Sequence, residues 1–471
     1  MSLTNGNTLK QLNIAILRLF IYSLYGFQIV IRSFSKTSKP ECCRILFYPK
    51  IRDEQKLADI VNRIAWYIPE TYSDFAEIRI IVEKSIIPKN IADLKTPSSQ
   101  ARYIKDRLNI QFVTDENGEL GKADCILIWK KSSLIHPKIL WQIKKIKIVD
   151  PTLYFSIEAE SYGRLLFSII SDEEKNRLYE NSKGNFNKLL STVGTYKKAY
   201  VFGTGPSLEK CAKNFDYSDG FTIICNTIVK NDDLMAYIHP HLLIFGDAQH
   251  HLGPSIYADQ FRKQVLLTNK TFDFFIGTHD YAVPLLLGNY PELKEYIIGI
   301  EANGVWELSL SEIVRMIIRR PHKIPWFDKI PGHPEEFNFP SLEKMYTRGL
   351  GSVLPTLLIP IASSVCTEIF ILGADGNDPK IRKPDEEYIW AYSTSCQFED
   401  LKYTTFETHP AYFRDRPFTE LFDIYCENYE DLLEYGENLG KKYYSLAPSY
   451  IPALANRQWH NSENKCMETK I

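Results

Sequence analysis

Short, continuously apolar runs alternate along the first part of the chain with stretches in which apolar residues recur at helical spacing. The run "CRILFYP" (residues 43–49) precedes "DEQKLADIVNRIAWYI" (53–68), where the apolar positions fall three and four residues apart. Further apolar runs occupy residues 77–83, 110–115, 123–130 and 145–150. Apolar strands that alternate with helices are typical of βαβ units and a mostly parallel sheet. The pattern predicts a Rossmann-like α/β domain over residues 41–170.

The same alternation resumes near residue 197 and predicts a second domain of this class, over residues 197–455. Its apolar runs occupy residues 199–203, 221–226, 241–247, 264–269, 295–300, 368–375 and 443–448. The polar stretch 171–196 predicts a linker between the domains, and residues 456–471 form a polar tail. The proline-rich segment 319–340 predicts a loop or lid. We therefore expect two Rossmann-like domains with mostly parallel sheets.

Residues 1–40 have a different pattern. The segment "NIAILRLFIYSLYGFQIVIR" (13–32) is almost wholly apolar, but Arg18 interrupts it. A membrane-spanning helix needs about 20 predominantly apolar residues, whereas an apolar helix flanked by basic residues suits the surface of an anionic membrane. We predict a helix that lies on the membrane surface. A helix packed on the protein's own core is the alternative.

The composition of the chain argues against several classes of binding partner and site. At 471 residues the chain exceeds one ordinary core, and its formal net charge of −2 gives no basic footprint for nucleic acid. The nine cysteines include no CxxC pair, which argues against a disulfide framework and against a thiolate zinc site. We expect a cytoplasmic protein, peripheral to the inner face of the membrane, with no nucleic-acid partner. Whether it forms a homo-oligomer stays open.

Polar residues stand at the ends of several predicted strands of the second domain. In a doubly wound sheet, ligands bind beyond the carboxyl ends of the strands. One such residue alone would be an ordinary turn residue, but a set of them predicts a hydrogen-bonding crevice. The members of the set are Thr204, Ser207, Asn226, Asp247 and Asp375.

The turn "GTGPS" follows the first strand of this domain. Gly203 and Gly205 permit tight backbone geometry and close approach of a ligand. Pro206 suits the first turn of the next helix, and the free N–H groups at that helix start, near Ser207, favour a phosphate. The turn is neither a P-loop nor a full GxGxxG fingerprint. It predicts a phosphorylated ligand without naming it.

Other candidate residues lie further along the chain. Arg348 precedes the turn "GLGS" and a long apolar helix, and Tyr388 and Tyr392 are four residues apart in "EEYIWAY". His409 lies in "THP", and Ser449 ends the run "LAPS".

The order of these motifs resembles the bacterial sialyltransferases that use a CMP-activated sugar. The matching motifs, over residues 199–454, are "GTGPSL", "IICN", Arg348 before "GLGS", "GAD" (Gly373 to Asp375), the two tyrosines, "THP" and "LAPS". Thr204 stands where that family has an asparagine that contacts the nucleotide, which puts the nucleotide and the sugar in doubt. "GPSL" followed by a strand that ends in Phe-Gly-Asp also resembles motility-associated-factor proteins and hydroxymethylpterin diphosphokinases.

The resemblance implies a function in polysaccharide biosynthesis: transfer of sialic acid, or a related 2-keto sugar acid, from a CMP donor to a glycan or glycolipid acceptor by direct displacement. It implies that His409 is the general base, that Tyr388 and Tyr392 hold the departing phosphate, and that Arg348 pairs with the donor's carboxylate or phosphate. A structural role for Arg348 is equally open. The implied nucleotide-binding residues are Gly203, Thr204, Gly205, Pro206, Ser207, Asn226, Asp247, Gly373, Asp375 and Ser449.

No metal or other cofactor is expected, because the resembling enzymes act through tyrosines. The first domain, whose opening strand lacks a glycine-rich turn, is expected to form the acceptor side of the cleft. Two alternatives remain: a diphosphokinase-like enzyme that binds Mg²⁺ through Asp247 and Asp375, and a non-catalytic nucleotide-binding relative.

Overall fold

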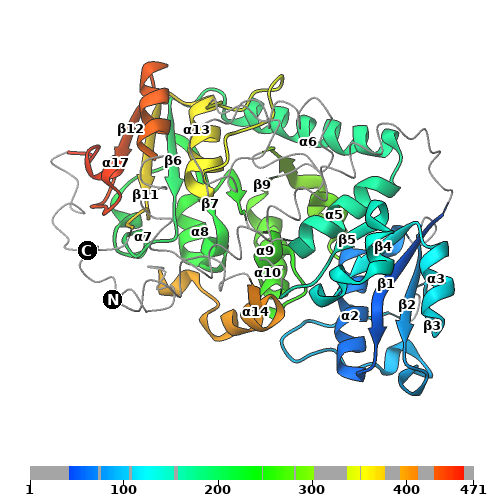
Figure 1. Cartoon of the computed structure of the whole chain (residues 1–471). Helices are drawn as coiled ribbons and strands as arrows, with labels where there is room; N and C mark the ends of the chain where they lie inside the picture. Colours follow the sequence, from blue (N-terminus) through cyan, green and yellow to red (C-terminus); the bar gives the residue numbers. More distant parts are fainter. Residues whose placement is uncertain are drawn as a thin grey trace, which may run out of the picture.

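The structure, a computed structural model of the chain, describes residues 42–72, 76–105, 109–152, 157–246, 248–279, 283–301, 337–350, 352–376, 393–411 and 429–460. They form two α/β units, each built on one sheet (Figure 1). The predicted surface helix at 13–32 lies outside these residues, as do most of the proline-rich segment and of the tail. Within them, no helix combines the length and the apolar character needed to cross a membrane.

The first unit contains a five-stranded parallel sheet in the order β3-β2-β1-β4-β5. The chain runs from β1 outward to β3 and then returns to β4 on the other side of β1. The switch point of this sheet therefore lies between β1 and β4. All five predicted strands are confirmed: β1 (Cys43–Ile51), β2 (Ala76–Val82), β3 (Ile110–Val113), β4 (Cys125–Ile128) and β5 (Ile146–Ile148).

The two faces of this sheet belong to different cores. Successive side chains of a strand point to opposite faces. Ile45 and Phe47 of β1 join a core cluster that continues through the second unit, whereas Leu46 and Tyr48 join a smaller cluster on the other face. The helices of this unit are α2 (Glu54–Tyr67), α3 (Glu116–Lys122), α4 (Pro137–Leu140) and α5 (Ile157–Ile169).

Residues 171–196, predicted as a linker, form helix α6 (Asp172–Val193), which packs on the second sheet. The side chain of Ser171 caps its start by accepting a hydrogen bond from Glu174 N at 3.0 Å. Asn185 Nδ2 donates to Ile297 O of the edge strand β10 (Ile297–Gly299) at 3.0 Å. Phe186 is fully buried. The polar outer face of α6 explains why the segment reads as a linker.

The second unit contains a seven-stranded parallel sheet in the order β10-β9-β8-β7-β6-β11-β12. The chain runs from β6 outward to β10 and returns to β11 beside β6, so the switch point lies between β6 and β11. Besides β10, its strands are β6 (Lys198–Phe202), β7 (Gly220–Cys225), β8 (Leu242–Ile244), β9 (Phe275–Thr278), β11 (Glu368–Leu372) and β12 (Lys442–Ser445).

One predicted strand of this unit is wrong. Residues 264–269 lie in helix α10 (Ile256–Phe272), which leaves Leu267 63% exposed while Val265 is buried. Ser255 caps the helix start by accepting from Ala258 N at 3.1 Å. A short apolar run cannot distinguish a strand from one face of a helix. The other helices here are α7 (Ser207–Cys211), α8 (Asp232–Ile238), α9 (Ala248–Leu252), α11 (Val283–Leu286), α13 (Ile359–Val365), α14 (Lys402–Thr408) and α17 (Pro452–Ala455).

The two units are joined by a buried polar contact around Arg262 of α10. The Arg262 guanidinium lies 4.0 Å from the ring centroid of Trp66 in α2 and donates to the Tyr103 hydroxyl at 2.7 Å. Tyr103 donates in turn to Asp259 at 2.9 Å. Arg262 also donates to His251 O and Gly253 O, each at 2.9 Å, and Asp259 forms an ion pair with Lys263, so both buried charges are hydrogen-bonded. The two units are therefore in direct contact through buried side chains.

The described cysteines include both free and bonded sulfurs. Cys43, Cys125, Cys225, Cys366 and Cys396 are buried free thiols. Chiefly through burial, the pKa of the Cys396 thiol rises to about 11. Cys211 differs, because its sulfur is disulfide-bonded. The cysteine spacing gave no sign of this bond.

Candidate functional site

The glycines of the "GTGPS" turn lie at the switch point of the second sheet, where their backbone packs against the turn after β11. Gly203 N donates to Leu372 O at 2.7 Å, and Gly205 N donates to Gly373 O at 2.8 Å. A Cβ on Gly203 would lie 2.4 Å from Gly373 O, and Gly373 itself has φ +75. Side chains are therefore excluded from both turns. The close approach of the two backbone segments therefore explains why glycine occupies these positions.

Asp375 occupies the start of helix α7. Its Oδ2 accepts a hydrogen bond from Ser207 N at 3.0 Å, and Ser207 Oγ accepts one from Gly373 N at 3.2 Å. The carboxyl is 2% exposed, and burial raises its pKa. Its Oδ1 makes no hydrogen bond with the described residues. The N–H that we expected to bind a phosphate is thus already bonded to a carboxylate.

Three further predicted residues surround this switch point. Ser449 Oγ donates to Ala374 O at 2.7 Å and so holds the turn after β11. Asn226 follows β7 in a left-handed conformation, with φ 49. Asn226 forms no side-chain hydrogen bond with the described residues. The Thr204 carbonyl accepts from Ser393 N at 2.7 Å. The structure therefore brings Thr204, Ser207, Asp375 and Ser449 together.

Residues 393–411, which we call the strap, connect this switch point to the first unit. At one end Ser393 Oγ donates to Gly205 O at 2.7 Å. In the middle, Gln397 Nε2 donates to Thr227 Oγ1 at 2.9 Å. The strap then forms α14, where Thr408 Oγ1 donates to Ser99 O of the first unit at 3.2 Å. In Figure 1, α14 lies between α7 and the first unit. The strap thus places His409 at the opposite end from the "GTGPS" turn.

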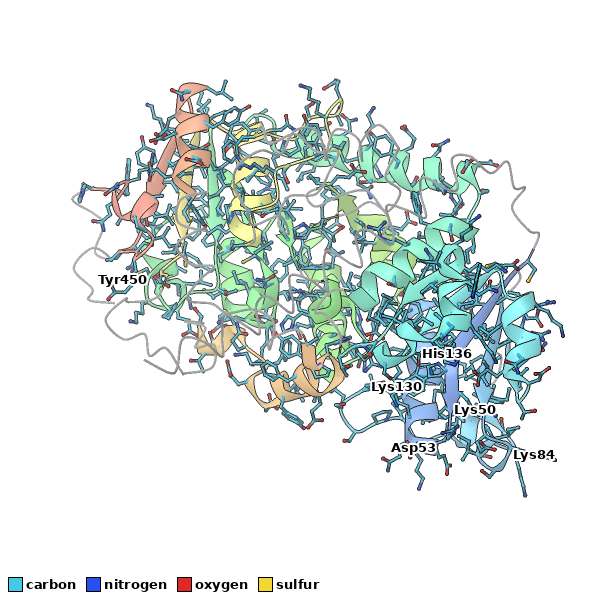
Figure 2. The ribbon with its side chains drawn as sticks, viewed as in Figure 1. Lys50, Asp53, Lys84, Lys130, His136 and Tyr450 are labelled. Carbon is cyan, nitrogen blue, oxygen red and sulfur yellow. The ribbon has the colours of Figure 1, made fainter. Side chains whose placement is uncertain are left out.

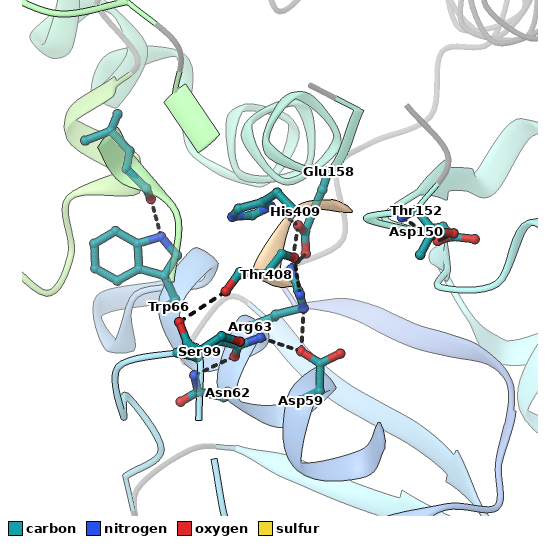
Figure 3. Close-up of polar contacts among 12 residues, drawn as sticks. Asp59, Asn62, Arg63, Trp66, Ser99, Asp150, Thr152, Glu158, Thr408 and His409 are labelled. Atoms are coloured by element: carbon teal, nitrogen blue, oxygen red, sulfur yellow. Dashed lines mark hydrogen bonds and ion pairs between the residues drawn. The ribbon is translucent and has the colours of Figure 1, made fainter. Parts of the chain in front are cut away.

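His409 lies at the junction of the two units, beside Glu158 in the first turn of α5 (Figure 3). His409 Nδ1 is 3.4 Å from Glu158 Oε2, and the two side chains are 2% and 3% exposed. Its Nε2 is buried and has no hydrogen-bond partner among the described residues. Burial lowers the pKa of His409, although Glu158 acts in the opposite direction. The ring is therefore neutral near pH 7, with Nδ1–H directed to the carboxylate.

Arg63 of α2 fixes the carboxylate in this position. Its Nη1 donates to both Glu158 oxygens, at 3.0 and 2.8 Å, and its Nη2 donates to Thr408 O at 2.6 Å. Its Nε donates to Asp59 at 2.6 Å. Burial acts to raise the pKa of Asp59, but the charges of Arg63 and Lys56 outweigh it and lower that pKa well below its usual range. The Asp59 carboxylate is therefore ionised near neutral pH.

Such an arrangement would suit an oriented general base. A carboxylate on Nδ1–H fixes the tautomer and stabilises the imidazolium that forms when Nε2 accepts a proton. Arg63 and Glu158 were not predicted from the sequence. The sequence feature that could have identified such a residue is a charge within an otherwise apolar helical pattern, such as Arg63 within "DIVNRIAWY".

The remaining predicted site residues are elsewhere or outside the described residues. The Arg348 guanidinium lies 4.5 Å from the ring centroid of Phe337. Tyr388, Tyr392 and Asp247 are outside the part of the chain that the structure describes. Within that part, no group of three or more His, Cys, Asp or Glu side chains could hold a metal ion.

No family model, curated protein or solved structure matches the chain.

Proposed function

We propose that the chain is a glycosyltransferase that moves an acidic sugar, sialic acid or a related 2-keto sugar acid, from a CMP donor to a glycan or glycolipid acceptor. The observation that carries the proposal is the buried pair of His409 and Glu158, with an unbonded Nε2, at the junction of two parallel α/β units. Such a pair suits deprotonation of a hydroxyl. The motif order that resembles the CMP-sugar sialyltransferases supplies the class of donor.

The reaction would be one displacement. The acceptor oxygen forms a bond to the anomeric carbon while the bond from that carbon to the phosphate oxygen breaks, and CMP leaves with the bonding electrons. His409 Nε2 takes the acceptor's hydroxyl proton, and Glu158 stabilises the resulting imidazolium. Arg63 holds Glu158 in place through its two hydrogen bonds.

The nucleotide would bind at the switch point between β6 and β11. Asp375 Oδ1 has no hydrogen-bond partner among the described residues, and it would bond the base or the ribose together with the Asn226 side chain. Because Asp375 already bonds Ser207 N, we assign the phosphate to Tyr388 and Tyr392 rather than to the start of α7. That assignment rests on the resemblance.

The acceptor would reach His409 only after a local opening. The ring is 2% exposed, so the strap and α2 must separate before a hydroxyl can approach Nε2. The predicted membrane-surface helix at 13–32 would bring a lipid-linked acceptor to the protein. Both features belong to the proposal.

A nucleotide panel on the full-length protein tests the donor class. We expect CMP or CDP, without a metal, to raise the melting temperature, because a ligand at 100 times its Kd stabilises the folded state by about 2.7 kcal/mol. Stabilisation by ATP with Mg²⁺ alone would indicate a diphosphokinase instead, and no stabilisation by any nucleotide would indicate a scaffold protein that kept the fold.

The variant Asn226→Gly sharpens this test, because glycine keeps the left-handed backbone and removes only the side chain. It should reduce the shift caused by CMP. Asp273→Gly, at another left-handed position (φ 51), is the matched control and should leave the shift unchanged.

A further inference from the structure

The first unit contains a cavity of about 520 Å³ that the proposed function does not use. Tyr48 and Pro49 of β1, Glu116 of α3, and the segment after β4 line it. From that segment the lining residues are Ser132, Ser133, His136 and Pro137. The cavity therefore lies beside the C-terminal half of β1, the start of α3 and the segment after β4, next to the switch point of the first sheet. Ligands of open α/β sheets bind in that position.

The position separates this cavity from the His409 site. Tyr48 belongs to the core cluster on the sheet face opposite the one that joins the second unit. In Figure 2, His136, Lys50 and Lys130 all lie on the first unit.

The lining groups suit a ligand with several hydroxyls. Ser132, Ser133 and the His136 ring both donate and accept hydrogen bonds, and the Glu116 carboxylate accepts them. Burial, and then the neighbouring charge of Glu116, raise the pKa of Tyr48 to about 12, so the phenol keeps its proton. Pro49 and Pro137 add apolar surface for the C–H faces of a ring. The volume falls within the range of about 300–1,000 Å³ that is typical of small-molecule sites.

The surrounding charges favour an anionic ligand. Lys50 directly follows the lining residue Pro49, and Lys130 starts the segment that carries the two serines. Neither ammonium group forms an ion pair within the described residues. The nearby Asp53 is already engaged, since it accepts a hydrogen bond from Lys56 N at 2.7 Å as the cap of α2. Among the described residues these two lysines have no anionic partner, and a phosphate or carboxylate would supply one.

We infer that the switch point of the first sheet is a second binding site, for a sugar or polyol that carries a phosphate or a carboxylate. Its hydroxyls would bond Glu116, Ser132 and Ser133, and its anionic group would bond His136, Lys50 and Lys130. This inference is independent of the proposed function, because it uses neither His409 nor the nucleotide site.

Calorimetric titration of the full-length protein tests the inference. The probes are glucose 6-phosphate and glucuronate, with glucose and inorganic phosphate as their neutral and non-sugar counterparts. We expect saturable binding of at least one anionic sugar. Glucose and inorganic phosphate should each bind more weakly by about tenfold or more. Glucose lacks the charge-assisted hydrogen bonds of the anionic group, and inorganic phosphate lacks the hydrogen bonds of the sugar hydroxyls.

Two variants assign the binding to this cavity. The double variant Lys50→Gln/Lys130→Gln removes the rim charges, and Ser133→Trp fills the cavity. Each should weaken binding by about tenfold or more. Lys84→Gln is the matched control, because Lys84 is exposed at a different edge of the same unit, and it should bind as the parent does.

Three results would overturn the inference. They are the absence of saturable binding by either anionic sugar, equal affinity for inorganic phosphate, and equal weakening by the double variant and by Lys84→Gln. If Ser133→Trp fails to fold, the lysine variants decide alone, since Lys130 is exposed and Lys50 half-buried.

Discussion

His409 and Asp375 are two buried titratable groups that keep one polar atom without a partner among the described residues. Burial lowers the pKa of His409 and raises the pKa of Asp375, so in both cases it favours the neutral form. Groups with shifted pKa values in such positions are enriched at functional sites. Asp375 lies near the first residue of the strap and His409 near its last. The resemblance implied that both residues belong to one site, whereas the structure places them apart.

The pH dependence of stability tests the environment of His409. Its pKa is lower in the folded than in the unfolded state, where it is about 6.5. As the pH falls through that value, the unfolded chain takes up a proton that the folded chain does not. The free energy of unfolding should therefore fall, by at most about 1.4 kcal/mol per pH unit from this residue.

Urea titrations between pH 7.5 and 5 would measure this effect. His409→Gln should show a shallower loss of stability on acidification than the parent. His460→Gln changes an exposed histidine and should follow the parent. Equal slopes for His409→Gln and the parent would mean that His409 is not buried in its neutral form.

At the scale of elements, the contact between the turns after β6 and β11 fixes the switch point of the second sheet. Gly203→Ala would place a methyl group 2.4 Å from Gly373 O. Because neither backbone segment can move without losing its hydrogen bonds, we expect a loss of about 1–3 kcal/mol in the free energy of unfolding. Chemical denaturation would measure it.

Gly184→Ala in α6 is the control for this substitution. A Cβ there meets nothing within 4 Å, and alanine in a helix interior is more stable than glycine by about 0.5–1 kcal/mol. The two glycine substitutions should thus change stability in opposite directions. A stabilising Gly203→Ala would refute the packing explanation.

The sequence predicted correctly those strands that consist of a short apolar run buried on both faces of the sheet. The strands of the first unit are short and apolar, and all were expected. Residues 264–269 were not assigned correctly, because three apolar residues in a row, Val265 to Leu267, fit both a strand and a helix face. Glu158 and Arg63 could not be assigned to the site, since their meeting with His409 depends on contacts between residues 95 and more positions apart.

At the scale of the whole molecule, the two units share one hydrophobic core and a buried polar interface. The sequence indicated two domains but not how they meet, because the Arg262, Trp66 and Tyr103 contact joins distant segments. We expect the two units to unfold together rather than as independent domains.

Arg262→Met tests this coupling. The variant removes the hydrogen bond to Tyr103 and the cation–π contact with Trp66, and it takes away the Arg262 donor of the His251 and Gly253 carbonyls. Removing a buried hydrogen bond to a charged group typically costs about 1.5–3 kcal/mol. Denaturation followed by tryptophan fluorescence and by circular dichroism should give coincident transitions for the parent and a lower midpoint for the variant. Unchanged stability would contradict a shared interface.

The proposed transfer reaction is tested most directly by the rate of CMP release from CMP-N-acetylneuraminate, measured against pH with a panel of glycan acceptors. The parent rate should fall below the pKa of His409, where the base is protonated. His409→Gln should be slower by roughly 10²–10⁴-fold and lack that acid limb. His460→Gln should match the parent. Acceptor-dependent release that is equally fast in His409→Gln, or no release by the parent with any acceptor, would contradict the account.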